Sequence, residues 1–126
     1  MAALNECALA IVTSIPLVDM KTAGATSLYT VPVGKIFYPF SIIVRVPSAS
    51  LAGGTEYDFG IGANCDTWKQ NVDLSSLTAV TDYIIVTALT KFQNCVAGSV
   101  FGIKVITGAT GAATATVDVI GYLVDA

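Results

Sequence analysis

The chain has 126 residues, of which 54% are hydrophobic and only 12% are charged, and its formal net charge at pH 7 is −3. This length suits a single domain with its own hydrophobic core, while the few scattered lysines and arginines exclude a basic stripe for binding nucleic acid through its phosphates. The uncharged runs are too short, and too often broken by Pro or Gly, for the roughly 20 apolar residues of a membrane-spanning helix, so no membrane is expected as a partner.

The first 26 residues carry two weak strand patterns, at 8–12 and 17–21, with Pro16 between them. Two interpretations stay open: this segment is the first strand region of the domain, or it is an arm that reaches a neighbouring subunit. A short helix over 2–10 is a further alternative, and a loop is expected at 23–25. The start of the chain has no basic residue and does not resemble a secretory signal, so synthesis in the cytoplasm is expected.

The strongest pattern lies at 27–46 and predicts a short strand, a tight turn at 31–34 and one long strand from Lys35 onward. From Ile36 to Val46 every even position is apolar, which predicts that the even positions form the buried face of this strand. Pro39 cannot donate a backbone hydrogen bond, so the strand is expected to be bulged there or to lie at a sheet edge.

The rest of the chain alternates between short strand patterns and loops at 46–55, 63–76 and 107–113. The further strands are predicted at 56–62, 81–88, 91–95, 99–106 and 114–124. The segment 81–88 is apolar on both faces and therefore needs cover on both sides, which a subunit contact would supply.

These elements amount to about eight short strands at a spacing near ten residues, without a convincing helix. The pattern predicts an all-β fold, an antiparallel β-sandwich of jelly-roll type. Residues 27–126 are expected to form the sandwich, preceded by the arm or first strands at 1–26.

The search for catalytic chemistry returns mostly exclusions. The chain has no histidine, so the Ser-His-Asp and Cys-His arrangements are absent. Glu56 and Asp58 lie on one face of a predicted strand, and Asp66 follows; such acids could serve a glycosidase or bind calcium. The simpler interpretation, which we adopt, is that they form the solvated face of a half-buried strand. We therefore predict no enzymatic activity, no metal and no cofactor.

The three cysteines, Cys7, Cys65 and Cys95, form no CxxC pair. Free, buried thiols are the expected state. A disulfide between Cys65 and Cys95 is the alternative, because both lie near predicted strand ends.

The shortage of charge bears on the surface, since roughly 25% of residues are charged in an average domain. A surface rich in Thr, Ser, Ala and Gly is one explanation; cover by another chain is the other, and we expect a homo-oligomer. The residues predicted to form the interface with another chain are Trp68, Tyr83, Ile84 and Val86. Trp68 with Tyr57 or Tyr83 would also suit an aromatic platform for a sugar, or Trp68 would simply seal one end of the sandwich.

Four stretches carry a resemblance to known proteins: SLYTVPVGK at 27–35, VPSAS at 46–50, YDFGIG at 57–62 with Trp68 after it, and ATVDVIGY at 115–122. Together they resemble small β-sandwich virion proteins of tailed bacteriophages, which are head decoration (cement) proteins or parts of tail fibres. The similarity covers roughly residues 27–124. Its motifs are structural, and no catalytic residue is carried over.

The resemblance implies a structural virion protein, made in the host cytoplasm, that forms trimers on the capsid surface and clamps neighbouring subunits of the major capsid protein. The alternative from the same resemblance is a tail-fibre or receptor-binding module that recognises host surface glycans. A small glycosidase that uses Glu56 and Asp58 is the third hypothesis. Head and tail locations imply different partners, so they are separable by experiment.

Overall fold

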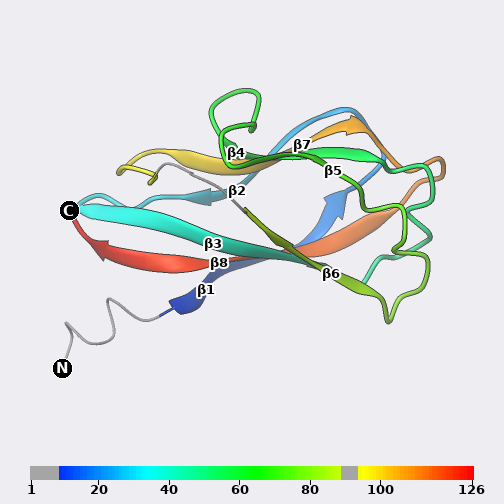
Figure 1. Cartoon of the computed structure of the whole chain (residues 1–126), viewed down its shortest axis with the longest axis horizontal. Coiled ribbons are helices and arrows are strands. Elements are labelled where there is room, and N and C mark those ends of the chain that lie inside the picture. Colours follow the sequence, from blue (N-terminus) through cyan, green and yellow to red (C-terminus); the bar gives the residue numbers. More distant parts are fainter. Residues whose placement is uncertain (1–8, 89–93) are drawn as a thin grey trace.

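The computed structural model describes residues 9–88 and 94–126, which form two packed antiparallel sheets of four strands each (Figure 1). The eight strands are β1 (Leu9–Asp19), β2 (Gly24–Thr30), β3 (Lys35–Arg45), β4 (Glu56–Ile61), β5 (Lys69–Val72), β6 (Tyr83–Thr87), β7 (Val100–Thr107) and β8 (Thr114–Asp125). The described ranges contain no helix of the length and hydropathy needed to cross a membrane.

One sheet has the order β1-β8-β3-β6 and is called the β3 sheet below; the other has the order β2-β7-β4-β5 and is called the β7 sheet. Apart from β4 and β5, consecutive strands lie in opposite sheets, which is the connectivity of an eight-stranded jelly roll. The predicted antiparallel, jelly-roll sandwich is therefore confirmed.

The two strands predicted on either side of the turn at 31–34 do not pair with each other, because β2 and β3 lie in different sheets. The turn instead crosses from one layer to the other at one end of the sandwich. The N–H of Val31 donates to the carbonyl of Ser99, and Gly98 donates to the carbonyl of Val31, so this end is tied to the turn before β7.

The N-terminal alternatives are decided for residues 9–26, which belong to the sandwich. β1 is one continuous strand that pairs with β8 from Leu9–Tyr122 to Asp19–Thr114. β1 can contain Pro16 for two reasons. Its register against β8 shifts twice, and it is an edge strand of the described sheet, so no strand on its other side needs a hydrogen bond from the N–H that Pro16 lacks. Of the loop expected at 23–25, Ala23 lies in the bend between β1 and β2, whereas Gly24 and Ala25 already belong to β2. Most of the helix considered at 2–10 lies outside the described residues.

β3 follows the predicted strand but not the predicted face. Phe37 is fully buried, whereas Tyr38 and Phe40 are exposed. The register with β8 shifts between Pro39 and Ser41, so Phe40 is an extra residue, and beyond it the buried apolar positions, Ile42 and Val44, are even-numbered. The predicted bulge at Pro39 is confirmed, but the prediction that all even positions face the core is wrong for the first half of the strand. β3 is also an interior strand, not an edge.

The remaining strands lie close to their predicted positions, with one omission. β4, β6, β7 and β8 agree with the patterns at 56–62, 81–88, 99–106 and 114–124. β5 was not predicted, because its four residues fall in the polar stretch taken as a loop. The strand expected at 91–95 lies mostly outside the described residues, although Cys95 forms an isolated antiparallel bridge with Phe37.

The core between the sheets is built around a row of aromatic rings. Phe37 makes edge-to-face contacts with Tyr29 and Phe101, at centroid distances of 5.3 and 6.2 Å. Phe101 makes a similar contact with Trp68 at 5.9 Å. Each such pair stabilises the fold by about 0.5–1.5 kcal/mol beyond its area burial. The row joins β2, β3 and β7 to the segment before β5 and holds the two layers together.

Gly121 in β8 lies beneath this row, opposite Pro39. A Cβ at this position would lie 2.3 Å from the carbonyl oxygen of Tyr38 and 2.5 Å from the ring of Phe37. We predict that Gly121→Ala lowers the free energy of unfolding by about 1–3 kcal/mol, because neither the backbone of a central strand nor a buried ring can move away cheaply. Urea denaturation measures the change.

Gly111→Ala is the matched control, because a Cβ at Gly111 would meet no atom within 4 Å. Its stability should stay within about 0.5 kcal/mol of the original. Equal stability of the two variants would contradict the close packing of Phe37 on β8.

Candidate functional site

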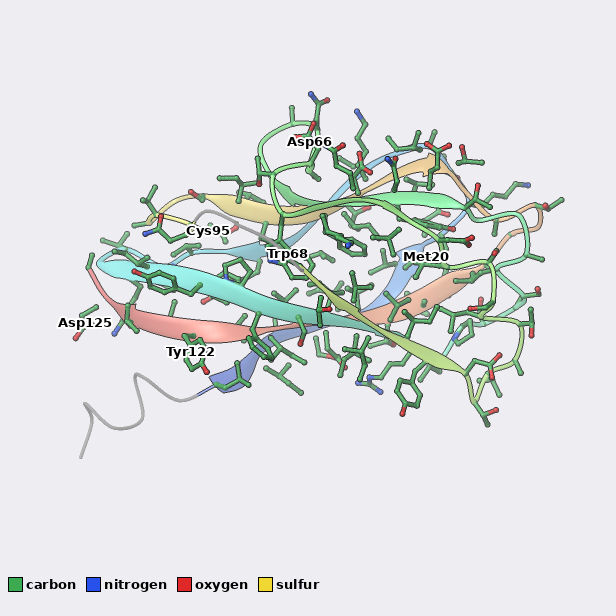
Figure 2. All side chains as sticks on the ribbon, in the orientation of Figure 1. Met20, Asp66, Trp68, Cys95, Tyr122 and Asp125 are labelled. Carbon is green, nitrogen blue, oxygen red and sulfur yellow. The ribbon has the colours of Figure 1, made fainter. Side chains whose placement is uncertain are left out.

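The most distinctive surface is the side of the β3 sheet that points away from the core, which we call the apolar face. All four strands of the sheet contribute large apolar side chains to it, each between 37% and 63% exposed. They are Leu9 and Ile11 from β1, Tyr38 and Phe40 from β3, Tyr83 and Ile85 from β6, and Tyr122 from β8. Figure 2 shows Tyr122 on this side, with Trp68 and Met20 between the sheets.

The strand register brings these side chains into neighbouring rows. Tyr122 is paired with Leu9 on one side and with Tyr38 on the other, so three strands contribute to one row. The ring of Phe40, the extra residue of the bulge, makes an edge-to-face contact with Tyr122 at 6.4 Å. The bulge therefore creates this part of the apolar face, because it turns both Tyr38 and Phe40 outward.

An ionic cluster interrupts the apolar face. The carboxylate of Asp118 is 4% exposed and accepts hydrogen bonds from Nε of Arg45 at 2.8 Å and from Oγ of Ser14 at 2.5 Å. Burial favours the neutral acid, but these hydrogen bonds and the charge of Arg45 together hold the pKa of Asp118 below its ordinary value. The cluster is internally neutralised, so it adds no net charge to the face.

This geometry predicts a pH-dependent contribution of Asp118 to stability. A carboxyl whose pKa is lower in the folded state stabilises the protein above its unfolded pKa, and the contribution disappears as the pH falls through the folded value. We expect Asp118→Asn to lower the free energy of unfolding by about 1–3 kcal/mol at pH 7. The gap should shrink below the ordinary aspartate pKa of 3.8.

Denaturation at a series of pH values measures this effect, with Ser14→Ala as a milder variant that removes one of the hydrogen bonds. A gap that stays constant from pH 7 to pH 3 would show that Asp118→Asn acts through packing and not through charge.

The predicted interface residues separate into two groups. Tyr83 is exposed on the apolar face, while Ile84 and Val86 point to the other side of β6, half-buried and buried respectively. Trp68 is only 7% exposed and packs on Phe101 between the sheets, so it does not form the exposed aromatic platform that was one of the two interpretations. Tyr57, its suggested companion, is fully buried and donates from its hydroxyl to the carbonyl of Met20 at 2.7 Å.

The candidate acids lie on the β7 sheet, away from the apolar face. Glu56 and Asp58 are both half-buried, and Asp58 accepts a hydrogen bond from the backbone N–H of Asn71 at 2.9 Å, which helps to hold β5 against β4. Asp66 lies on the loop that stands above this sheet (Figure 2). Within the described ranges, no group of three or more His, Cys, Asp or Glu side chains is placed to hold a metal ion.

That loop rests on two glycines that face each other across β4 and β7. A Cβ on Gly60 would meet the backbone nitrogen of Thr67 at 2.4 Å, and one on Gly102 would meet Sγ of Cys65 at 3.0 Å. Beside them lies a small, half-open cavity of about 210 Å³ with Cys65 in its wall. Burial raises the pKa of this thiol, which keeps it protonated and a poor nucleophile.

The described cysteines, Cys65 and Cys95, are both free and buried. The expected free thiols are therefore confirmed for these two residues, and the alternative disulfide is not formed. Burial raises the pKa of Cys95 to about 11. Cys7 lies outside the described residues.

Comparison with known proteins adds nothing to these observations, because no family model, curated protein or solved structure matches the chain.

The sequence analysis missed most of the apolar face. Its assignment of the even positions of β3 to the core placed Tyr38 and Phe40 inside. The signal that could have found them was already present in Pro39, since a bulge reverses the inward and outward positions on its two sides.

Proposed function

We propose that this protein is a structural virion protein, a capsid decoration protein that associates with copies of itself and binds the major capsid protein to stabilise the shell. The observation that supports the proposal is the apolar face of the β3 sheet. Adhesion of this kind needs exposed apolar area on a stiff support, and a sheet of paired strands over an aromatic core provides both. The resemblance of residues 27–124 to decoration proteins supplies the capsid as the partner and favours a three-fold oligomer.

The size of the apolar face fits a macromolecular contact. With exposures of 37–63%, its seven large side chains present on the order of 700 Å². A standard protein interface covers about 800 Å² per partner, and large exposed apolar patches are uncommon on soluble monomers. Its only described ionic cluster, Arg45 with Asp118, is neutralised internally, so the face suits a partner surface that is itself largely uncharged.

A tail-fibre or receptor-binding module remains the second candidate. Three exposed tyrosines on the apolar face, Tyr38, Tyr83 and Tyr122, could stack against sugar rings and hydrogen-bond through their hydroxyls. This version differs from the one first suggested by the sequence, because it does not use the buried Trp68. Binding to a glycan array that is lost on Tyr122→Ala would favour it.

The proposal predicts where the protein lies on virus particles. In electron micrographs, an antibody raised against this protein should label the heads of purified particles of the virus that encodes it. Label on the fibres would favour the tail module, and particles without label would contradict both candidates.

A surface variant tests the face itself. We expect Phe40→Glu to reduce binding of the purified protein to empty, expanded shells of the same virus by at least about tenfold, because burying an unpaired carboxylate at the contact is costly. Ile106→Glu is the control, since Ile106 is 42% exposed, close to the 49% of Phe40, and lies on β7 in the other sheet. Equal binding of both variants in a sedimentation assay would show that another surface contacts the shell.

A further inference from the structure

The four edge strands of the sandwich differ in how well they are protected against pairing with another chain. A free edge presents unpaired N–H and C=O groups, and proteins usually blunt it with bulges, prolines, charges or short length. β1 contains Pro16 and two register shifts, and β2 contains one register shift. β5 has four residues, begins with Lys69, shifts register against β4, and holds Asn71 at a φ of 56°.

β6 is also short, with five residues, but it carries none of the other features. Its sequence, YIIVT, has no charge, proline or glycine, and all five residues pair with β3 without a register shift. The nearest acid, Asp82, is engaged in its own turn, where its carboxylate accepts from the N–H groups of Thr78 and Ala79 at 3.0 and 2.9 Å. β6 is therefore a regular, β-branched, uncharged edge, the kind that favours addition of another strand.

We propose that β6 pairs antiparallel with β6 of a second copy about a two-fold axis, which joins two β3 sheets into one continuous eight-stranded sheet. The inference deepens the proposed function, on which it rests for self-association, by assigning one surface and one partner to it. An antiparallel pair centred on Ile85 places Ile85 opposite itself, Tyr83 opposite Thr87 and Ile84 opposite Val86. Each is a β-branched or aromatic pair of the type that stabilises sheets, and no like charges meet.

The inner side of this edge supports the same partner. A groove of about 310 Å³ runs between β5 and β6, with Val72, Ile84 and Val86 among its lining residues. Among the described residues, no further strand covers the core side chains at this edge of the sandwich. If the two β6 strands pair about Ile85, the core-facing sides of both β3 sheets lie on the same side of the joined sheet. Ile84 and Val86 of the second copy would then extend the wall of this groove.

Charge also suits a second copy. Lys69 and Asp73, of opposite sign, line the groove at opposite ends of β5. The carboxylate of Asp73 accepts hydrogen bonds from the hydroxyl and N–H of Ser75, which lower its pKa and keep it ionised. A two-fold axis reverses the strand direction, so the Lys69 end of one copy lies on the same side as the Asp73 end of the other. The contact would thus be electrostatically self-complementary.

The pairing is closed. A two-fold contact uses the same strand on both copies, so it consumes the β6 edge and leaves only β1 at each end of the joined sheet, where Pro16 and two register shifts resist further addition. It also doubles the apolar face, because the outward residues of β6 stay on the same side as those of β3. If a three-fold contact exists elsewhere, β6 joins two trimers instead of two monomers.

Native mass spectrometry and sedimentation equilibrium of the full chain test the inference with a matched pair of variants. Ile85→Lys places two ammonium groups opposite each other at the axis, and we expect it to weaken assembly by at least about tenfold. Ile11→Lys is the control: Ile11 is 57% exposed and Ile85 56%, and both lie on the apolar face, but Ile11 belongs to the opposite edge strand. The original chain and this control should form even-numbered species.

Cross-linking gives a second measurement that does not depend on affinity. Facing residues of antiparallel strands have Cα atoms about 4.5–5.5 Å apart, within the range that a disulfide spans. In a Cys7→Ser background, Ile85→Cys should oxidise to a covalent dimer, whereas Ile11→Cys should not.

Even-numbered species that Ile85→Lys disrupts, with selective cross-linking at position 85, would support the inference. A chain that stays monomeric, odd-numbered species alone, or assembly unchanged by Ile85→Lys would overturn it. The proposed function fails on a different result, absence of the protein from virus particles, so the two failures are distinguishable.

Discussion

The bulge at Phe40 is the constraint on which both the core and the surface of this protein depend. A regular β3 would place either Phe37 or Ile42 in the core, because the two residues differ in parity. One extra residue between Pro39 and Ser41 lets both point inward, so the aromatic row and the aliphatic half of the core are filled by the same strand. The same shift turns Tyr38 and Phe40 outward. A single inserted residue therefore determines what the core contains and what the surface offers.

The sequence predicted the class of fold because half-buried strands carry a clear alternation, as in Tyr57, Phe59 and Ile61 of β4. It did not predict β5, which has one buried residue among four and is held by the carboxylate of Asp58, a contact distant in sequence. Turn residues at 31–34 indicated a reversal, but sequence does not reveal whether a reversal stays in its sheet or crosses to the other one. Exposure could not be predicted for the same reason: Trp68 and Phe40 are both large apolar residues in the sequence, and only the packing shows that Trp68 is buried and Phe40 exposed.

The small share of charged residues in the chain is reflected in the apolar face, where large apolar side chains take the place of charged ones. An ordinary sheet with one face in water alternates apolar and polar residues, yet the β3 sheet has large apolar side chains on both sides. The one acid at the centre of the outer side, Asp118, is screened by Arg45 and Ser14 rather than by water. The Arg45 side chain is 45% exposed, so the ion pair keeps one solvated end and gives this part of the face a polar group without net charge.

The edges of the two sheets indicate how such a surface avoids uncontrolled association. An apolar face next to regular open edges would favour indefinite growth, since each added strand leaves a new edge. Three of the four edges here are interrupted by bulges that lie on the edge strands themselves, at the cost of regular pairing with their neighbours. Among the four edge strands only β6 has no bulge, and a two-fold contact between two β6 strands would leave no free edge at that contact. Because a regular, uncharged edge favours addition of another strand, this difference between β6 and the other three edges is the observation on which the proposed two-fold contact rests.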